Sequence, residues 1–394
     1  MAAGPLIGGA VTTYLTWRLV FAGEVVVVGV ILALTRRIHD TPPVGRVHLD
    51  VPGVVLSATG LGLVVFGVLR AGAWGWVRPK PDAPSVLGLS GTIWLILVGL
   101  IVLRLFLAWQ NHLVDKGGEP LVTPELLRNT RVVGGLTMFF FQFLVQAGLF
   151  FTVPLYLSVA LGLSALDTGV RLLPLSVTLL LAAVGVPRFL PQASPRRIVT
   201  WGLLGLIAGI VSLIAALDVG SGPEIVTVPL LLVGLGVGAL ASQLGAITVS
   251  SAPERLTGEV GGVQNTMTNL GASLGTALAG SILIGGLTAS FLAGIEANKA
   301  VPQEVAATAQ TQLSSGIPFL SDAQLEDALT EADVPGDVAS AVVEENTKAR
   351  IVALRASLAA IALVAGLALF FTRLLPTRPI AGDTPELPEG AGAT

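Results

Sequence analysis

The apolar residues of this chain fall into continuous runs of about 20 residues, and this run length constrains the fold more than any other feature. An α-helix rises about 1.5 Å per residue, so about 20 residues cross the roughly 30 Å hydrocarbon core of a bilayer. Soluble proteins carry about 25% charged residues, whereas this chain carries 12% and is 53% hydrophobic. Because backbone polar groups must be satisfied within each segment in lipid, continuous apolar runs predict helices. The expected fold class is all-α, a polytopic transmembrane helix bundle.

We expect ten hydrophobic segments along the 394 residues. The first, residues 1–15, is too short to span a bilayer comfortably. The N-terminus has no Lys or Arg before its apolar stretch, so it does not resemble a secretory signal peptide. The other nine segments are expected at residues 19–35, 51–70, 87–108, 132–160, 169–190, 198–217, 225–250, 259–287 and 351–375.

Lys and Arg residues are unevenly divided between the two sets of helix ends, and this predicts the orientation. With residue 1 in the cytoplasm and alternating helices, thirteen lie at one set of ends and five at the other. Cytoplasmic connections carry the excess, so we expect the 36–50 and 109–131 connections and the C-terminus in the cytoplasm. The thirteen are Arg36, Arg37, Arg46, Arg104, Lys116, Arg128, Arg131, Arg188, Arg196, Arg197, Arg255, Arg373 and Arg378. The five are Arg18, Arg70, Arg78, Lys80 and Arg171.

Residues 288–348 form the one sizeable hydrophilic segment, with ten acidic and two basic residues. The predicted topology places this segment outside the cytoplasm, where it is expected to form a solvated cap. Ser321 and Gln324 have the spacing of a capping box that opens a short helix. Pro335 is expected to be the first residue of a longer helix that continues into the last span.

Motifs for catalysis or cofactor binding are absent or accidental. The chain has no cysteine, no His-Glu-x-x-His and no phosphate-binding loop, and its net charge of −3 gives no indication of a nucleic-acid partner. Gly271-Ala272-Ser273-Leu274-Gly275 matches the nucleophile-elbow pattern, but here it lies in a membrane segment and not at a strand-to-helix turn. We therefore expect no enzyme, no catalytic residue, no metal site, no cofactor and no nucleic-acid partner.

Small residues four positions apart indicate close helix packing. Tight packing is the default interpretation of each pair, and together the pairs predict a compact bundle whose helices rock or slide against one another. The four pairs are Gly4/Gly8, Gly234/Gly238, Gly258/Gly262 and Gly271/Gly275.

Polar side chains inside spans are costly and commonly face a partner or a water-filled path. A face of aromatic rings and amides suits an amphiphilic organic solute. The alternative is interhelical hydrogen bonding, worth about 0.6–2 kcal/mol per contact. The candidate residues of the substrate path are Phe139, Gln142, Phe143, Gln146 and Phe150 in one segment, Gln243 in another, and Gln264, Asn265 and Asn269, with Thr276, in a third.

Short motifs over nearly the whole chain resemble one transporter family. Gly4-Pro5-Leu6-Ile7-Gly8-Gly9 resembles the core of the antiporter motif in the fifth helix of the major facilitator superfamily. Trp17-Arg18-Leu19-Val20-Phe21 resembles the sequence that follows it in the fourteen-helix drug:proton antiporters of the EmrB/QacA type. Shorter matches lie at Asp50-Val51-Pro52-Gly53, Trp74-Gly75-Trp76, Pro154-Leu155-Tyr156-Leu157, Leu161-Gly162-Leu163-Ser164-Ala165, Thr168-Gly169 and Gly261-Gly262-Val263-Gln264-Asn265.

The resemblance implies a major-facilitator fold without its first four helices, since ten segments and four more make fourteen. Residues 1–35 would be the last two helices of the amino-terminal half, with the antiporter motif at Gly4, Pro5, Gly8 and Gly9. Residues 36–131 would hold two extra central helices and cytoplasmic connections. Residues 132–375 would be the carboxyl-terminal six-helix half, with the extracytoplasmic loop at 288–348, and residues 376–394 a cytoplasmic tail.

The resemblance implies a proton-coupled efflux transporter for drugs or metabolites in the inner membrane, with the lipid bilayer, protons and a small amphiphilic solute as partners. The second hypothesis is a transport-incompetent membrane protein that only associates with others, and the third is an intramembrane enzyme. Glu24 is the one carboxylate well inside a predicted span and clear of a connection. We expect it either to carry or sense the coupling proton, or to reach the external interface or a neighbouring helix.

Overall fold

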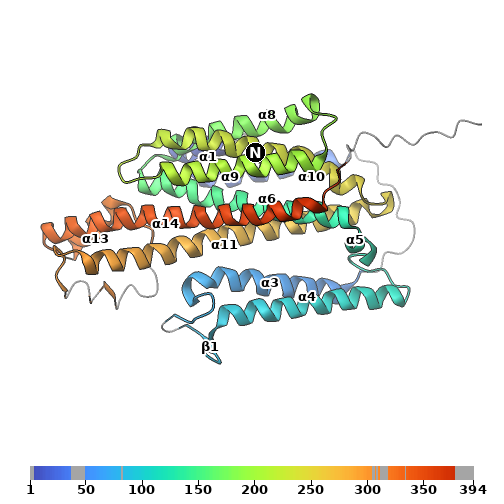
Figure 1. Ribbon diagram of the computed structural model, residues 1–394, viewed down its shortest axis with the longest axis horizontal. Coiled ribbons are helices and arrows are strands. Elements are labelled where there is room, and N and C mark those ends of the chain that lie inside the picture. The colour runs from blue at the N-terminus through green and yellow to red at the C-terminus, as the bar shows by residue number, and fades with distance from the viewer. Residues whose placement is uncertain are drawn as a thin grey trace, which may run out of the picture.

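The computed structural model describes residues 4–36, 49–80, 83–303, 307, 309–310, 318–332 and 334–377, and Figure 1 shows it as a bundle of long helices. The helices are α1 (Gly4–Tyr14), α2 (Arg18–Thr35), α3 (Val51–Trp74), α4 (Gly91–Asp115), α5 (Pro124–Arg128), α6 (Thr130–Leu155), α7 (Ala165–Arg171), α8 (Leu173–Phe189), α9 (Pro195–Ala216), α10 (Thr227–Ser250), α11 (Thr257–Ala297), α13 (Asp322–Glu331) and α14 (Gly336–Phe371). Strands β1 (Ser85–Val86) and β2 (Leu89–Ser90) form a hairpin. Short turns of other helix types are η1 (Tyr156–Ala160), η2 (Pro223–Val226), η3 (Glu254–Leu256) and η4 (Thr372–Leu374).

Nine helices in the described part of the chain are long and apolar enough to cross a membrane. They match the nine full-length segments expected from the sequence, and α1, with 11 residues, is short as expected. The all-α prediction is confirmed, and the chain is a multi-pass membrane protein.

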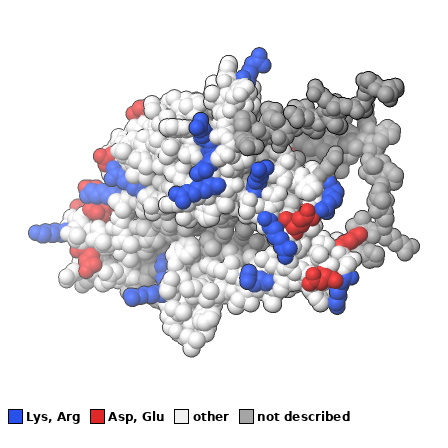
Figure 2. Space-filling model, turned by 45° about the vertical axis from the view of Figure 1, so that its right-hand side comes forward, with Lys and Arg blue, Asp and Glu red and all other residues white. Residues whose placement is uncertain are grey.

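Connections between the spans alternate between two ends of the bundle. At the end that holds α5 in Figure 1, the amide of Asn129 donates to the carbonyl of Ser251 (2.7 Å), so the start of α6 lies beside the end of α10. The backbone N–H of Arg196, at the start of α9, donates to the carbonyl of Pro376, just beyond η4 (3.3 Å). This end therefore gathers the connections that the basic residues assign to the cytoplasm, and Figure 2, turned to bring it forward, shows basic side chains across it.

The opposite end holds the β1–β2 hairpin and α13 (Figure 1). There the hydroxyl of Tyr156 donates to the carbonyl of Ser221 (3.2 Å). Arg355 Nε donates to the carbonyl of Leu217 (3.0 Å). Arg350 and Arg355 belong to this end and are not among the five residues counted there from the sequence, so the charge contrast between the ends is smaller than that count.

Two helices project beyond the spans predicted at 259–287 and 351–375. α11 has 41 residues and α14 has 36, which makes them about 62 and 54 Å long at about 1.5 Å per residue. Figure 1 shows both reaching past their neighbours toward α13. Much of the hydrophilic segment is therefore helical extension. Pro335 is the residue before α14 and not its first helical residue, because α14 begins at Gly336.

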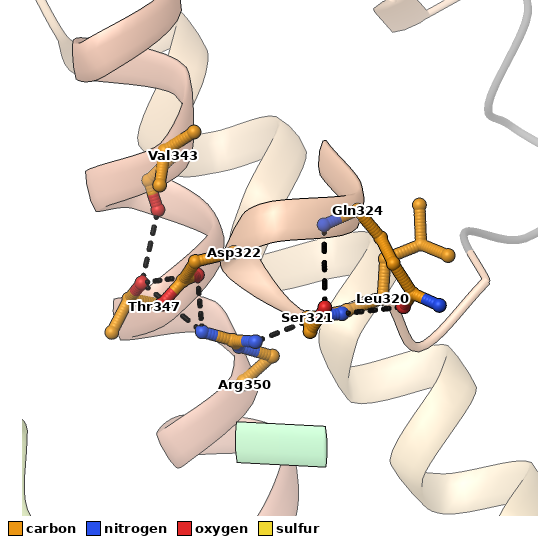
Figure 3. A network of polar contacts seen from close by, with 7 residues as sticks. All are labelled: Leu320, Ser321, Asp322, Gln324, Val343, Thr347 and Arg350. Carbon is orange, nitrogen blue, oxygen red and sulfur yellow. Dashed lines mark hydrogen bonds and ion pairs between the residues drawn. The ribbon is translucent and has the colours of Figure 1, made fainter. Parts of the chain in front are cut away.

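Helix α13 is held against the projecting part of α14 by a buried arginine (Figure 3). Ser321 and Gln324 form the predicted capping box at the start of α13. The side chain of Arg350 is 1% exposed and pairs with Asp322 of α13. The hydroxyl of Thr347 donates to the same carboxylate oxygen (3.0 Å). A guanidinium buried so deeply requires such partners, so this network fixes the cap on α14.

Helix α6 lies at the centre of the bundle, in contact with α11, α14 and α10. Gly271 and Gly275 of α11 lie so close to it that a Cβ at either position would overlap the carbonyl oxygens of Phe140 and Leu144. The pattern Gly271–Gly275 is therefore a helix-packing surface, as predicted.

The other glycine pairs divide into two groups. Gly234 and Gly238 of α10 approach the α8 backbone as closely as the α11 pair approaches α6. In contrast, a Cβ at any glycine of the Gly4/Gly8 and Gly258/Gly262 pairs would have no neighbour within 4 Å among the described residues. Helix packing in this chain is confirmed for two of the four pairs.

Helices α3 and α4 form a hairpin on the side of α11 away from α9 and α10 (Figure 1). Gly60 and Gly99 bring the two helices together, since a Cβ on Gly99 would lie 2.9 Å from the carbonyl oxygen of Gly60. A Cβ on Gly72 would lie 3.2 Å from the Cα of Ser281, so α3 also packs directly on α11.

Candidate functional site

The aromatic and amide side chains predicted on one face of α6 lie in the bundle interior. Phe139, Gln142 and Gln146 are buried, and Phe143 and Phe150 are half-buried. The rings of Phe139 and Phe143 are stacked, with centroids 6.5 Å apart. The face is thus a real stripe on α6, but it is covered by protein over most of its length.

Packing around this stripe is mostly apolar. Phe139 belongs to a cluster that includes Leu203 of α9 and Leu244 of α10. Gln142 is 4% exposed, and its Oε1 atom has no hydrogen-bond partner among the described residues. A buried amide oxygen without a partner costs about 1–3 kcal/mol. A hydrogen bond from a polar group to this oxygen would remove that cost.

Gln243 of α10 lies near the same depth as Gln142. A Cβ on Gly135 would lie 2.5 Å from Thr248 Oγ1, which fixes the register of α6 against α10. Seven residues along α6 lead from Gly135 to Gln142, and five residues back along α10 lead from Thr248 to Gln243. The two amides are therefore within about one helical turn of the same depth. Gln243 is buried, and its Nε2 donates to the hydroxyl of Ser242 (3.3 Å).

The polar residues of α11 lie on an exposed stripe. Asn265, Asn269 and Thr276 are all exposed, and Gln264 beside them is half-buried. Asn269 Nδ2 donates to the Asn265 carbonyl (2.9 Å). Thr276 donates to the carbonyl of Ala272 (3.1 Å). Among the described residues these groups bond only to their own helix. Polar side chains at this depth are costly to place against lipid.

The α11 stripe and the α6 stripe share one depth. Gly271 and Gly275 contact α6 at Phe140 and Leu144, so Asn269 and Thr276 lie within about one helical turn of Gln142 along the bundle. The structure therefore brings the predicted polar residues of α6, α10 and α11 to one level, with the α6 and α10 amides buried and the α11 residues exposed.

The predicted antiporter motif lies on α1, which packs against α7. A Cβ on Gly9 would lie 2.5 Å from the Ala165 carbonyl oxygen, so this glycine allows the close approach of the two helices. The hydroxyl of Thr13 accepts the backbone N–H of Leu166 (3.1 Å). Gly4 and Gly8 have open space where a Cβ would be, and the side chain of Pro5 lies outside the described atoms.

Glu24 lies on α2, which has no buried residue. The helix contacts α1 alone among the pairs of elements in extensive contact. Glu24 itself is exposed. Neither of the two roles expected for this carboxylate is favoured by the packing of the described residues.

A polar network at the α5 end was missed in the sequence. Asp50 is buried, and its carboxylate accepts hydrogen bonds from Gly53 N–H (2.9 Å), Trp109 Nε1 (2.9 Å) and Gln110 Nε2 (2.6 Å). Burial raises the pKa of Asp50, but the hydrogen bonds lower it by more, so the pKa lies below its ordinary value of 3.8. The sequence signal was the Asp-Val-Pro-Gly start of α3, in which Asp is an N-cap and Pro lies in the first turn.

The same network continues to α11. Gln110 Oε1 accepts the N–H of Val122 (3.1 Å), which directly precedes Thr123. The hydroxyl of Thr123 donates to Glu259 Oε2 (2.7 Å), and its N–H donates to the other oxygen. The α3–α4 hairpin is thereby tied to the start of α11 at this end. The spacing of 136 residues between Thr123 and Glu259 explains why no local pattern predicted the contact.

Groups of His, Cys, Asp and Glu that would hold a metal ion are absent from the described residues. The polar stripes instead combine amides, hydroxyls and phenyl rings. Such a set can orient a mostly apolar solute by hydrogen bonding, but it contains no nucleophile paired with a base.

Comparison with known proteins agrees with this chemistry. The sequence pattern of the Major Facilitator Superfamily matches residues 1–276. The tetracenomycin C resistance and export protein of Streptomyces glaucescens is 28% identical over 289 residues, which are 72% of this chain and 50% of that protein. The puromycin resistance protein pur8 of Streptomyces alboniger is 30% identical over 309 residues, 74% of this chain and 56% of that protein. The multidrug efflux pump LfrA of Mycolicibacterium smegmatis is 24% identical over 349 residues, 87% of this chain and 65% of that protein.

The chain spans about half to two-thirds of the length of these relatives. The names of these relatives describe resistance, export and efflux.

Proposed function

Because this chain belongs to the Major Facilitator Superfamily, we propose that it forms the larger part of an efflux transporter that exports an amphiphilic organic solute in exchange for protons. The observation that carries the proposal is the exposed stripe of Asn265, Asn269 and Thr276 on α11. Polar groups in the middle of a membrane helix are stable beside a polar path or another helix, but not beside lipid tails.

The substrate class rests on the residues at the level of this stripe. Phe139 and Phe143 offer ring faces, and Gln142 has a buried oxygen without a partner among the described residues. Mostly apolar surfaces with a few orienting polar groups bind amphiphilic molecules. Transporters of this architecture move solutes past such a midplane site by rocking one half against the other.

In the finer proposal, α1 and α2 correspond to helices five and six of a fourteen-helix antiporter, α3 and α4 to its two extra central helices, and the six spans from α6 to α14 to its carboxyl-terminal half. The contact of α1 with α7 supports this assignment, because it places the glycine motif against that half. The separate α3–α4 hairpin supports it as well. Four preceding helices would then complete the transporter in the cell membrane.

Transport by a completed chain tests the proposal. Four amino-terminal helices from one of the relatives are fused before Met1, and cells are loaded with a panel of fluorescent amphiphilic dyes. We expect the fusion to empty at least one dye severalfold faster than the 394-residue chain does. An inserted fusion that exports none of the panel would favour the second hypothesis, in which the protein only associates with other membrane proteins.

The antiporter motif is tested in the same fusion with Gly8→Leu. We expect this variant to insert normally and to lose efflux, because the leucine would fill a smooth surface that neighbouring helices need. Gly62→Leu on α3 is the matched control, since a Cβ there also has no neighbour within 4 Å. Normal efflux by Gly8→Leu would remove the motif from the mechanism.

The α6 stripe is tested with Gln146→Leu. If it lines the substrate path, the order in which the dyes are exported changes while at least some are still exported. A uniform loss in proportion to the amount of protein would instead assign Gln146 to helix packing.

Proton coupling through Glu24 is tested with Glu24→Gln in the same fusion, by measuring dye-induced proton flux in vesicles across a range of pH. We propose that this carboxylate carries or senses the proton, since it is the one acid well inside a predicted span. Retained dye binding with lost dye-induced proton flux is expected. Unchanged flux at every pH would leave Glu24 with a structural or interfacial position only.

A further inference from the structure

A basic cavity of about 620 Å³ lies where the α8–α9 connection meets the end of α14. Arg196 and Arg197 of α9 and Arg373 of η4 line it. Its eleven described lining residues include no carboxylate. None of the three arginines makes an ion pair with another described residue. Three cations around one cavity favour an anion as its occupant.

Hydroxyl groups complete the polar side of this cavity. Ser194, Thr200 and Thr372 are among its lining residues. The backbone N–H groups of Arg196 and Arg197 are already bonded, to the carbonyls of Pro376 (3.3 Å) and Ser194 (2.9 Å). An anion would therefore be held by the arginine side chains and not by the free N–H groups of a helix start.

An apolar groove of about 540 Å³ adjoins the basic cavity and shares Arg197 and Trp201 with it. The groove lies along α8, α9 and α10, and its other lining residues include Val186, Leu232 and Leu235. Gly202 and Gly236 let α9 and α10 approach closely at its floor, since a Cβ on Gly202 would lie 3.0 Å from the Gly236 carbonyl oxygen. The groove is therefore open where glycines stand in place of residues with larger side chains.

Trp201 stands at the junction of the two spaces and is 73% exposed. It lies six residues into α9 from Pro195, or about 9 Å along the helix. Tryptophan is enriched at this depth, between headgroups and acyl chains. A basic cavity followed inward by an exposed tryptophan and an apolar groove has the order of groups that a phospholipid presents.

We propose that the Arg196–Arg197–Arg373 cavity and the adjoining groove bind one anionic phospholipid, with its phosphate among the arginines and an acyl chain along α8, α9 and α10. The end that holds the cavity is the one that the basic residues assign to the cytoplasm, so the lipid would come from the inner leaflet. Basic pockets between helices on this side suit anionic headgroups. A free phosphate would occupy the cavity but would not fill the groove.

Native mass spectrometry of the purified 394-residue protein tests the site. The protein is mixed with phosphatidylglycerol or with phosphatidylcholine of the same acyl chains, and retained lipid is counted. We expect at least fivefold more retained phosphatidylglycerol. The triple variant Arg196→Gln/Arg197→Gln/Arg373→Gln should lower retention to the phosphatidylcholine level. The control Arg131→Gln/Arg188→Gln removes two exposed arginines outside the cavity and should change nothing.

The groove is tested separately with Gly205→Leu, which leaves all three arginines in place. A Cβ at Gly205 has only the Leu232 carbonyl oxygen near it, at 3.9 Å, so the leucine fits and fills the groove. We expect a severalfold loss of retained phosphatidylglycerol. Gly366→Leu on α14, where a Cβ has no neighbour within 4 Å, is the control.

Three results would overturn the proposal. Equal retention of both lipids, or full retention by the triple variant, would remove the arginine site. Displacement of phosphatidylglycerol by soluble glycerol phosphate, together with normal retention by Gly205→Leu, would identify a free phosphate as the occupant. If the triple variant does not fold, the single variant Arg373→Gln and Gly205→Leu decide the question.

Discussion

Helices α2 and α6 are both apolar enough to span a membrane, yet they are buried in the bundle to very different extents. In the most apolar stretch of each span, 67% of the residues are buried for Thr130–Ala160 and none for Arg18–Thr35. Hydropathy therefore identifies a span but not its neighbours. Small residues, such as Gly271 and Gly275, mark the face of a helix that packs against another helix. Polar residues, such as Asn269, mark a face that no described helix covers.

Helix α11 shows both conditions on one element. Its glycine face packs closely against α6, and its amide face is exposed. Substitutions on the packed face should therefore lower the stability of this chain much more than substitutions on the exposed face.

The largest effect is expected for Gly275→Leu on the packed face. A Cβ there would overlap the backbone of Leu144, so α11 and α6 must separate. Overpacking of this kind costs about 3 kcal/mol or more when backbone has to move. In detergent, the thermal unfolding temperature should fall strongly for this variant. It should not change for Gly262→Leu, because a Cβ at Gly262 has no neighbour within 4 Å. Equal decreases in the unfolding temperature of the two variants would show that the two faces of α11 do not differ in packing.

A smaller effect is expected for Asp50→Asn, which replaces the oxygen that accepts from Gln110 with an amide N–H group and leaves a neutral oxygen for Gly53 and Trp109. We expect a loss of about 2–3 kcal/mol at neutral pH. Because the folded-state pKa lies below 3.8, the stabilisation by this carboxylate is fully present above that pH and is lost as the pH falls through the lower value. Unfolding midpoints of the two proteins should therefore converge below about pH 3.8. A constant difference at all pH values would contradict the assignment.

Asp322→Asn should have a smaller effect than Asp50→Asn, since its carboxylate is 42% exposed. Loss of the charged partner leaves Arg350 buried with weaker bonds, which we expect to cost about 1–2 kcal/mol. A protease that cuts after glutamate should cleave α13 at Glu326 or Glu331 several times faster than in the unaltered protein. The control is Asp327→Asn on the same helix. Unchanged cleavage would mean that Arg350 does not hold the cap.

The smallest effect is expected for Asn269→Leu on the exposed stripe. No neighbour covers this side chain among the described residues apart from its own helix. Substitutions at uncovered positions usually change stability by about 0.5 kcal/mol or less. Unfolding of this chain should therefore be nearly unchanged. A loss as large as that of Gly275→Leu would show that the stripe is already part of a packed interface.

Much of the fold followed from the sequence, because span length and hydropathy are local properties. The nine long spans, the short first helix and the capping box at Ser321 were predicted correctly. The extension of α14 was predicted as well, as a helix that starts at Pro335 and continues into the last span. The outer extension of α11 was not predicted, since charged residues in a helix beyond the membrane resemble a loop by hydropathy. Pro335 was placed one residue too far into α14.

The candidate site was predicted less completely than the fold. The polar residues of α6, α10 and α11 were identified, because amides inside apolar runs stand out. Their burial was not predictable, since it depends on which helices pack together. Contacts between distant residues, such as Thr123 with Glu259 and Arg350 with Asp322, have no local signal. The depth shared by Gln142 and Asn269 likewise follows only from the packed glycines.

Cysteine accessibility shows directly whether the α11 stripe faces water, because the chain has no cysteine of its own. Single substitutions Asn269→Cys on the polar stripe and Leu363→Cys on an exposed apolar position of α14 are reacted with a water-soluble maleimide in membranes. If the α11 stripe lines an aqueous solute path, Asn269→Cys reacts readily and Leu363→Cys does not, and an exported dye protects the first in the completed transporter. Equal reactivity at the two positions, or none at Asn269→Cys, would contradict the account.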